Sequence, residues 1–516
     1  MRIIDFFDRG ASLYPHRVCL KDEHGQWTFD QVQRMSYRAA RALHARGIQA
    51  GERIAVYSPN GAIAFAAVLA IFRAGGVWLP VNVRNPLPET IEYLTNNACA
   101  AVFFGAKYEA QAREIRAALP GLKHTGCLDA AFEHEPDFLS WCEPQDDSPL
   151  DADVSNASVA IIKSTGGTTG KPKSVMISHR NFATMVANFL ACMPHDEPPV
   201  NLVAVPMTHG AGNIALALLA LGGTLVFMER ADTALILKNI ESERVSTMFL
   251  PPTVIYSLLS HPDARKYNYT SLRYMIYSAA PMSVDKLREA LDLFGPVMTQ
   301  AFGQTEAPLL CTFMGPKEHI LDDPEALRKR LSSCGRATPF TRVAIMDDHG
   351  RLLGDGEVGE IVVRGDMVML GYHDNPAETE AASRFGWHHT GDVGMRDADG
   401  YFYIVDRKKD MIISGGFNIY PSEIEQVLWS HPAVQDCAVV GVPDPKWGEA
   451  VIAIVELKNG QSVTEQTLSD FCREQLGGMK TPKRIEFWQE LPRSPVGKVL
   501  KRDIREKFWQ GQSRRV

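Results

Sequence analysis

Thr165-Gly166-Gly167-Thr168-Thr169-Gly170-Lys171-Pro172-Lys173 is the stretch of sequence that decides how this chain is interpreted. Its glycines let backbone N–H groups point into one concavity, its threonines add hydroxyl donors and its lysines add positive charge. These features are typical of a loop that holds phosphate groups. A solvated turn has the same composition, so the rest of the chain must decide between the two.

The loop does not match the P-loop of NTPases. That signature needs Gly, four residues, Gly-Lys and then Ser or Thr, whereas the first position here is Thr165 and Pro172 follows Lys171. Apolar, strand-like segments at 160–162 and 174–177 flank the loop. We therefore expect it to close a hairpin, whereas a P-loop opens a helix.

Length and composition indicate a soluble globular protein with at least two domains. The chain has 516 residues, of which 45% are hydrophobic and 22% charged, with a net charge of −7 and no evident repeat. These values argue against a disordered chain, a solenoid and a nucleic-acid binder with a basic surface all round. The segment from Gly478 onward differs, because its eleven Lys and Arg outnumber four acids. That basic tail indicates either an anionic ligand or a solvated face.

Cysteine spacing and apolar stretches bear on the compartment. The nine cysteines are scattered singly with no C-x-x-C pair, which is typical of reduced thiols and not of disulfides or a zinc site. The N-terminus has no signal-peptide pattern. Gly222-Gly223 divides the apolar stretch 212–228 into a helix-length piece and a strand-length piece, each too short to span a bilayer. We expect a cytoplasmic protein without a transmembrane segment.

The order of predicted elements indicates an α/β fold that changes character along the chain. Up to about residue 310, strands at 53–57 and 101–104 alternate with helices at 62–74 and 108–118, as in parallel βα units. From about 342 to 405 the pattern predicts short antiparallel strands. The charged run 406–410 then predicts a hinge or a solvated turn.

A separate α/β module of about a hundred residues is predicted beyond that run. Its first helix is expected to begin near Pro421, with Ser422 and Glu425 as a capping box.

Six segments in this order resemble the adenylate-forming superfamily of acyl-CoA synthetases, adenylation domains and luciferases. They are the loop 165–173, Ser278-Ala279-Ala280-Pro281, 300–306 (QAFGQTE), Thr390-Gly391-Asp392, 406–410 (DRKKD) with Gly415-Gly416, and 492–498 (PRSPVGK). The resemblance covers essentially the whole chain. It implies a large N-terminal domain of two doubly wound αβ subdomains plus a small β-barrel, and a smaller, mobile α+β C-terminal domain. The implied bounds are 1–408, with the barrel at about 320–408, and 409–516.

The resemblance also implies a set of nucleotide-binding residues. Thr165, Thr168, Thr169 and Lys173 would hold the β- and γ-phosphates, Thr305 the α-phosphate, Glu306 would ligate Mg²⁺, and Asp392 with Arg407 would hold the ribose. Phe302, where the family commonly has tyrosine, would stack on adenine. The full implied set for ATP and AMP is Thr165, Gly166, Gly167, Thr168, Thr169, Gly170, Lys173, Ser278, Ala279, Ala280, Pro281, Ala301, Phe302, Gly303, Gln304, Asp392 and Arg407.

Other positions are implied for the chemistry and for coenzyme A. Catalytic roles would belong to Lys498, which would bridge carboxylate and α-phosphate, and to Thr305, Glu306 and His209. Lys409 would be the hinge of a rotating C-terminal domain, and Gly415 and Gly416 would leave room for the pantetheine arm. An acyl pocket would include His209, Phe249, Thr253, Tyr277, Ala280 and Pro308.

The resulting hypothesis is an AMP-forming acid–CoA ligase that uses ATP, Mg²⁺ and coenzyme A on a hydrophobic carboxylic acid. The segment 206–212 contains no Asp or Glu. The ammonium group of an amino-acid substrate would therefore lack a counter-ion, so amino-acid substrates are disfavoured. A medium-chain, branched, aromatic or polycyclic acid would fit. Two alternatives stay open: an enzyme that loads a separate carrier protein, and a catalytically silent binding protein. The expected partners are small molecules and not nucleic acid, and a homodimer is left open.

Overall fold

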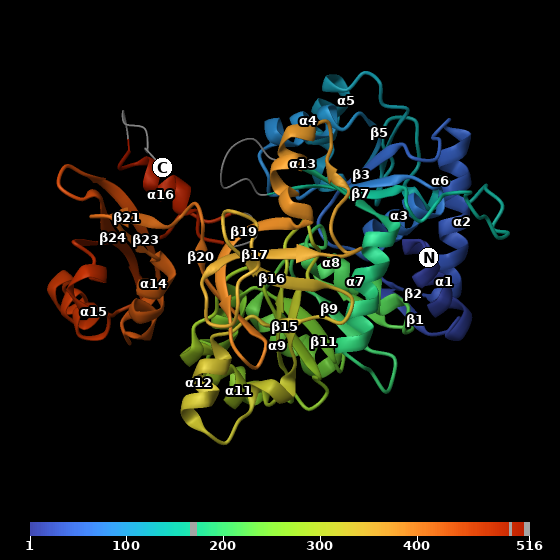
Figure 1. The fold of residues 1–516 in the computed structure, drawn as a ribbon. Helices are drawn as coiled ribbons and strands as arrows, with labels where there is room; N and C mark the ends of the chain where they lie inside the picture. Colours follow the sequence, from blue (N-terminus) through green and yellow to red (C-terminus); the bar gives the residue numbers. More distant parts are fainter. Residues whose placement is uncertain (166–172, 495–497, 510–516) are drawn as a thin grey trace.

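The computed structural model describes residues 1–165, 173–494 and 498–509, and Figure 1 shows their fold. A 13-stranded sheet and a seven-stranded sheet are built from residues before 410, and a five-stranded sheet from residues after it. The third sheet and its helices, in orange and red, lie beside the larger body. Within the described ranges, no helix combines the length and apolar character needed to cross a membrane.

The seven-stranded sheet has a parallel centre and an antiparallel edge. Its order is β18-β8-β7-β4-β3-β5-β6, and all pairs from β7 to β6 are parallel. The antiparallel pair β7–β8 confirms the predicted hairpin around the loop. The strands are β3 (Arg53–Tyr57), β4 (Val77–Pro80), β5 (Cys99–Phe104), β6 (His124–Cys127), β7 (Val159–Ser164), β8 (Ser174–Ser178) and β18 (Gly371–Tyr372).

The helices of this first part alternate with its strands, as the sequence pattern predicts. The predicted helices at 62–74 and 108–118 are confirmed as α3 and α5, with small differences at their ends. The helices are α1 (Ile3–Leu13), α2 (Phe29–Ala45), α3 (Ala62–Arg73), α4 (Leu87–Asn96), α5 (Glu109–Ala118), α6 (Phe138–Cys142) and α7 (His179–Cys192).

The 13-stranded sheet has a parallel half that runs β13-β12-β11-β9-β10-β1, with β2 at its edge. Its strands are β1 (Val18–Lys21), β2 (Gln26–Thr28), β9 (Val200–Val203), β10 (Thr224–Phe227), β11 (Thr247–Leu250), β12 (Tyr274–Tyr277) and β13 (Met298–Phe302). The helices α8 (Gly210–Leu219), α9 (Thr233–Ser242), α10 (Pro252–Leu259) and α11 (Val284–Phe294) alternate with them. The apolar stretch 212–228 is therefore a helix followed by a strand, as predicted.

The antiparallel half occupies the region where the sequence predicts a small barrel. Its strands are β14 (Thr312–Met314), β15 (Gly335–Ala337), β16 (Arg342–Met346), β17 (Gly359–Arg364), β19 (His388–Arg396) and β20 (Tyr401–Arg407), with α12 (Pro324–Leu331) and α13 (Pro376–Ala382) between them. The antiparallel strands are confirmed, but among the described residues no pair closes them into a barrel. Because β14 pairs directly with β13, they continue the large sheet as an open edge.

The third sheet has the order β22-β21-β24-β23, with β25 beside β24. Its elements are β21 (Ile412–Ser414), β22 (Phe417–Ile419), α14 (Pro421–Ser430), β23 (Val434–Asp444), β24 (Gly448–Leu457), α15 (Glu465–Lys480), β25 (Arg484–Phe487) and α16 (Lys501–Glu506). The helix α14 begins at Pro421 as predicted.

The predicted capping box of α14 is wrong, because its two side chains are engaged elsewhere. Ser422 donates through its hydroxyl to the Val405 carbonyl. Glu425 is buried and accepts from the Val439 amide and from Lys501. Both side chains therefore tie the helix to neighbouring strands.

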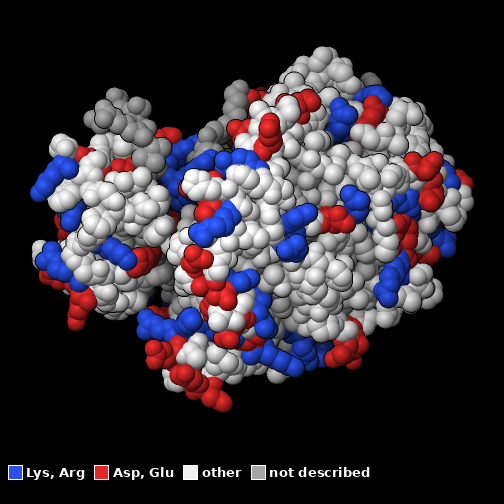
Figure 2. All heavy atoms as spheres, in the orientation of Figure 1, with Lys and Arg blue, Asp and Glu red and all other residues white. Residues whose placement is uncertain are grey.

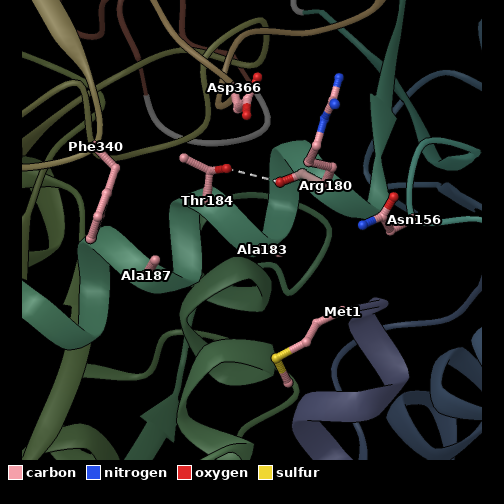
Figure 3. Close-up of a pocket in the computed structure, with 8 residues that line it drawn as sticks. All are labelled: Met1, Asn156, Arg180, Ala183, Thr184, Ala187, Phe340 and Asp366. Atoms are coloured by element: carbon pink, nitrogen blue, oxygen red, sulfur yellow. Dashed lines mark hydrogen bonds between the residues drawn. The ribbon is translucent and has the colours of Figure 1, made fainter.

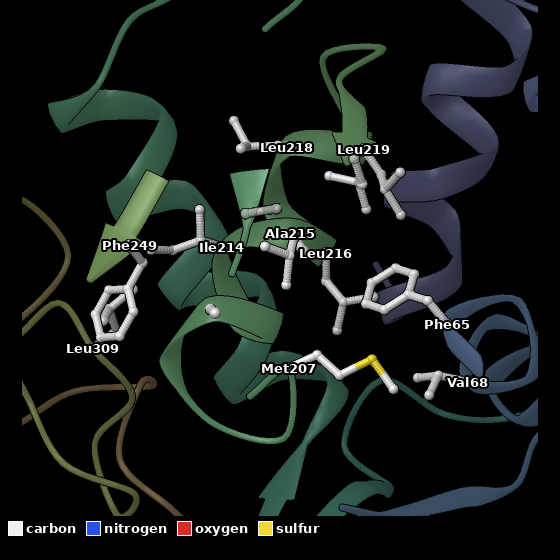
Figure 4. Packing of buried hydrophobic residues seen from close by; sticks show 14 of the residues in the cluster. Phe65, Val68, Met207, Ile214, Ala215, Leu216, Leu218, Leu219, Phe249 and Leu309 are labelled. Carbon is white, nitrogen blue, oxygen red and sulfur yellow. The ribbon is translucent and has the colours of Figure 1, made fainter. Parts of the chain in front are cut away.

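A continuous apolar core joins the two larger sheets. Figure 4 shows Phe65 and Val68 on α3 facing Met207 and Leu216 on the α8 side. Burying one such side chain stabilises the fold by about 2 kcal/mol. Gly212 permits the first turn of α8, since a Cβ there would lie 1.8 Å from the Met207 carbonyl oxygen. Packing thus places the start of α8 between the sheets.

Charges are interspersed on the face shown in Figure 2, with acids and bases both well represented. In the basic tail, most described cations pair with acids; these pairs are Lys480–Glu423, Arg484–Glu486, Arg493–Asp436, Lys501–Glu425, Arg502–Glu506 and Arg505–Asp410. The excess charge of this segment is therefore largely balanced by its neighbours.

Candidate active site

A sharp turn follows β13. A Cβ on Gly303 would lie 2.6 Å from the Leu309 backbone, so only glycine fits without moving the chain. The Gln304 amide closes the turn by donating to a backbone carbonyl three residues later, at 3.0 Å. Thr305 and Glu306 are left half-buried beyond the strand end. The close approach explains the glycine inside the predicted nucleotide motif.

The segment 278–281 lies at the neighbouring strand end. β12 and β13 pair in parallel, so the residues that follow them meet at the carboxyl edge of the sheet, where ligands of α/β folds bind. Ala279 has φ +74°, a conformation that costs a non-glycine residue roughly 1–3 kcal/mol. Ser278, Ala301 and Phe302 are buried, Ala280 is half-buried and Pro281 is exposed. The structure thus brings two predicted motifs together.

Gln304 connects this edge to β19. Its side-chain N–H donates to the Thr390 carbonyl at 3.2 Å, and its carbonyl oxygen lies 3.2 Å from Nε2 of His388. Burial lowers the pKa of His388 to about 4, so the ring is neutral at pH 7. This bridge fixes the distance between the turn after β13 and Asp392, two residues beyond Thr390.

Asp392 is the least satisfied acid of the site. It is 3% exposed, and its Oδ1 lies 2.6 Å from Nε of Arg407, the residue opposite it on β20. Its Oδ2 is buried and has no hydrogen-bond partner within the described residues. Burial raises the pKa of Asp392, while the Arg407 charge opposes the rise. Because buried polar atoms are normally paired, this oxygen fits a hydroxyl donor supplied by a ligand such as a ribose.

Lys498 comes close to the same carboxylate from the C-terminal side of the chain. Burial, repulsion by Arg407 and attraction by Asp392 and Asp410 together leave its pKa at about 8. Its backbone is held by Ser494, whose N–H donates to the Lys498 carbonyl at 2.7 Å. In the described part of the chain its ammonium makes no ion pair within 4.0 Å. A cation and an orphaned carboxylate oxygen therefore lie in one region.

The two ends of the phosphate loop are joined to each other. The Thr165 amide donates to the Lys173 carbonyl at 2.9 Å, and the Lys173 amide donates to the Thr165 hydroxyl at 3.3 Å. The predicted positions Gly166, Gly167, Thr168, Thr169 and Gly170 lie outside the described residues.

Sequence reasoning missed the residues that connect this loop to Glu306. The Lys173 ammonium pairs with Glu378 and lies 4.9 Å from the centre of the Tyr372 ring. The Tyr372 hydroxyl donates to Oε1 of Glu306 at 2.9 Å. A tyrosine about two hundred residues beyond the loop gives no local signal, because its place depends on the pairing of β18 with β8.

His209 immediately precedes α8. Its Nε2 lies 3.5 Å from the Asn82 amide nitrogen, and burial together with the Lys163 charge lowers its pKa to about 3. The ring is therefore neutral at pH 7. Lys163, at the end of β7, is a second residue that sequence reasoning missed, and burial lowers its pKa to about 8. A lysine inside an apolar strand was the signal that could have found it.

The other residues predicted for the acyl pocket differ in their burial and in their partners. The Phe249 ring packs on Gly210, where a Cβ would lie 2.9 Å from it, and Thr253 is half-buried on α10. Tyr277 is 2% exposed, and its hydroxyl lies 3.0 Å from Nε2 of His319, so its side chain belongs to the core. Pro308 is buried in the turn after Glu306.

Two hollows lie apart from the predicted nucleotide residues. A cleft of about 370 Å³ runs along the outer face of α7 and is lined by Met1, Asn156, Arg180, Ala183, Thr184, Ala187, Phe340 and Asp366. In Figure 3 the Thr184 hydroxyl bonds to the Arg180 carbonyl within the helix. A smaller cavity of about 30 Å³ lies behind Asn82 and Thr208. Neither contains a residue predicted for the site.

The predicted hinge and coenzyme A residues lie at the start of the C-terminal sheet. Burial and the nearby Lys173 charge lower the pKa of Lys409. Gly415 and Gly416 form the β21–β22 turn with φ of +59° and +82°. The Gly415 amide donates to the Trp447 carbonyl at 2.8 Å, and a Cβ on Gly415 would lie 2.7 Å from the Trp447 ring. Only a glycine allows this contact at such a φ.

Comparison with known proteins gives full-length relatives. The family described as AMP-binding enzyme matches residues 7–373, and the AMP-binding enzyme C-terminal domain matches residues 423–498. A feruloyl-CoA synthase from an Amycolatopsis species is 35% identical over 97% of this chain and 98% of its own length. A fatty acid–[acyl-carrier-protein] ligase, ScoC from Streptomyces coeruleorubidus, is 30% identical over 95% of this chain and 93% of its own.

A solved structure gives the same result for the fold. ATP-bound MatB from Rhodopseudomonas palustris superimposes with a TM-score of 0.88 at 29% identity, covering 98% of this chain and 99% of the other. Matches of this extent include both parts of the chain. The chain therefore belongs to the AMP-binding enzymes, the adenylate-forming family that its sequence motifs resemble.

Proposed function

We propose that the chain is an ATP-dependent acid–thiol ligase. It converts a hydrophobic carboxylic acid to an acyl-AMP with release of pyrophosphate, and then to an acyl-CoA and AMP. The observation that carries the proposal is the buried, unpartnered Oδ2 of Asp392, with Arg407 and Lys498 close by. The feruloyl-CoA synthase and the ATP-bound MatB support the acid, coenzyme A and ATP.

The first half-reaction needs charge to be neutralised. A carboxylate is a poor acyl donor because oxide would have to leave, so it attacks the α-phosphate and expels pyrophosphate. Carboxylate and triphosphate repel each other, and residues of the site must offset that repulsion while they hold both groups in line. In this proposal Lys173 and Thr165 hold the distal phosphates, Thr305 holds the α-phosphate, and Lys498 bridges it to the carboxylate.

Glu306 is proposed as the metal ligand. A carboxylate oxygen suits a hard cation, and Mg²⁺ is commonly bound by one or two carboxylates together with substrate phosphates. The described residues contain no cluster of three or more metal-ligating side chains, which agrees with a site completed by phosphate. Mg²⁺ bound there would neutralise phosphate oxygens as a Lewis acid.

Lys498 supplies the largest single contribution in this proposal. A charge pair at about 4 Å is worth about 4 kcal/mol at an effective dielectric near 20, or nearly three decades in rate. The second half-reaction needs the thiol of coenzyme A next to the acyl-adenylate, at the position that Lys498 occupies in the first half-reaction. We therefore propose two domains, 1–408 and 409–516, with rotation at Lys409 that exchanges Lys498 for the turn of Gly415 and Gly416.

The substrate acid is proposed to be hydrophobic. The helix α8 and the buried Phe249 are apolar, and the His209 ring directly before α8 is neutral. Coenzyme A is preferred over a carrier protein as acceptor, and the ScoC relative keeps carrier loading as the second candidate. A binding protein without catalysis is the third, and the set Glu306, Asp392 and Lys498 argues against it.

Pyrophosphate release from ATP, measured with a panel of aryl, branched, fatty and polycyclic acids, tests the proposal. Each acid is assayed with no thiol, with coenzyme A, and with a free carrier protein. We expect release with at least one acid, and thioester with coenzyme A. Release without a coenzyme A thioester would favour carrier loading, and no release with any acid would remove both enzymatic candidates.

A further inference from the structure

Tyr372 lies where three distant segments of the site meet. It ends the two-residue strand β18, which pairs antiparallel with β8 directly after the phosphate loop; Tyr372 itself pairs with Val175. Its amide donates to the Thr379 hydroxyl at 2.9 Å, which ties it to α13. The backbone of Tyr372 is thus fixed from both sides, and its side chain has little freedom to move away.

The Tyr372 hydroxyl fixes one oxygen of Glu306. It donates to Oε1 at 2.9 Å, and the Glu306 backbone carbonyl accepts from the Met369 amide at 2.7 Å. Within the described residues no donor reaches Oε2 of Glu306, which leaves that oxygen for a cation.

The Tyr372 ring restrains the loop lysine at the same time. The Lys173 ammonium lies 4.9 Å from the ring centre, a cation–π distance, and pairs with Glu378 on α13. One side chain therefore holds both the carboxylate proposed for the metal and the lysine proposed for the phosphates. Neither of the two needs to find its orientation when nucleotide binds.

We propose that Tyr372 is a positioning residue of the first half-reaction, whose hydroxyl orients Glu306 toward a divalent cation and whose ring holds Lys173 beside it. The proposal rests on the proposed function, because it assigns the cation and the phosphates to that site. It predicts that the hydroxyl and the ring have separable effects, the first on the metal and the second on the nucleotide.

Tyr372→Phe tests the hydroxyl, since it keeps the ring. Mn²⁺ binding is measured by electron paramagnetic resonance with a non-hydrolysable ATP analogue present, and we expect the Mn²⁺ dissociation constant to rise about tenfold, as for other groups that orient metal ligands. Tyr403→Phe is the matched control, because the Tyr403 hydroxyl donates to Asp397 at the same 2.9 Å away from the site. That control should bind Mn²⁺ like the wild type.

Tyr372→Leu tests the ring as well. We expect the metal effect of Tyr372→Phe plus a further rise of about threefold in the KM for ATP, the size of an exposed cation–π contact. Thioester formation from supplied acyl-adenylate and coenzyme A should stay at the wild-type rate in both variants. Wild-type Mn²⁺ affinity in Tyr372→Phe, or an equal loss in both half-reactions, would overturn the proposal.

A double variant tests whether the Tyr372 hydroxyl acts on the metal through Glu306. If the hydroxyl acts through Glu306, adding Tyr372→Phe to Glu306→Gln should weaken Mn²⁺ binding no further, and additive effects would contradict the assignment. Failure of the proposed function has a different signature: the wild type itself would then release no pyrophosphate and show no nucleotide-dependent Mn²⁺ binding.

Discussion

The residues proposed for the nucleotide, Asp392 and Lys498, differ from those proposed for the acyl group, Tyr277 and His209, in how their polar groups are paired; we call these two sets the nucleotide end and the acyl end. At the nucleotide end, Asp392 keeps a buried oxygen without a partner and Lys498 has a depressed pKa. At the acyl end, the Tyr277 hydroxyl is paired with His319, and His209 is neutral and close to Asn82. One group of residues has an unpaired buried carboxylate oxygen, whereas the polar side chains of the other lie close to partners within the protein.

Under the proposed function, this difference indicates which interactions would bind ATP and which would bind the carboxylic acid. Unpaired buried charge makes the nucleotide end sensitive to single polar substitutions. The acyl end depends on the fit of apolar surfaces, for which single changes shift selectivity by small factors. Substitutions at the two ends should therefore differ in the size of their kinetic effect and in the substrate whose kinetic constants they change.

Lys498→Ala should have the largest effect. We expect the acid-dependent release of pyrophosphate to fall about a thousandfold, because one charge contact near the phosphate is lost. Thioester formation from supplied acyl-adenylate should be largely spared. The measurement is the rate of each half-reaction on the same preparation, with Lys483→Ala, an exposed lysine of the same segment, as the control. Equal loss of both steps would contradict domain rotation.

Asp392→Asn should come next. It replaces the carboxylate by a neutral amide and removes the negative charge that lies 2.6 Å from Nε of Arg407. We expect the KM for ATP to rise about tenfold to a hundredfold, the range for a lost hydrogen bond to a charged group, with the KM for the acid little changed. Asp397→Asn, which alters a carboxylate bonded to Tyr403, is the control. A larger change in the KM for the acid would break the division between the two ends.

The pH dependence of adenylation should reflect Lys498. Its pKa of about 8 lies below the ordinary value, so the cation needed for the first half-reaction is present below pH 8 and is lost above it. We expect the adenylation rate to fall about tenfold per pH unit above that value. Thioester formation from acyl-adenylate should not show this fall.

Asp410→Asn would sharpen that test. The Asp410 carboxylate favours the charged form of Lys498, so its removal should move the descending limb to lower pH. A limb that does not move, or one that also appears in the second half-reaction, would show that another group controls it.

The candidate nucleotide residues, Gly303 and Asp392 among them, were selected through the family resemblance, whose motifs are short and contiguous in the sequence. The hairpin around the loop follows from the apolar runs on either side of it. Tyr372 and Lys163 were not found, since their positions depend on which strands become neighbours. The capping box at Ser422 failed for a related reason: contacts with Val405 and Val439, distant in sequence from the first turn, outweighed the local pattern.

The acyl end could be predicted only as apolar, because composition does not encode the shape of a packed surface. Phe249→Leu tests whether this apolar region binds the substrate acid, and its expected effect on kinetics is the smallest of those predicted here. The ring packs on Gly210 beside His209, so a shorter side chain should enlarge the space at the start of α8. We expect the ratio of kcat/KM values for a bulky and a small acid to shift about fivefold, within the range for one or two methylene groups.

The KM for ATP decides whether that shift belongs to the acyl end. It should stay within about twofold in Phe249→Leu, because no nucleotide contact is assigned to this ring. Phe294→Leu is the matched control, as Phe294 is similarly buried but packs against the Tyr269 ring. If both substitutions altered acid selectivity alike, the effect would come from general loosening of the core, and Phe249 would lose its place in the acyl pocket.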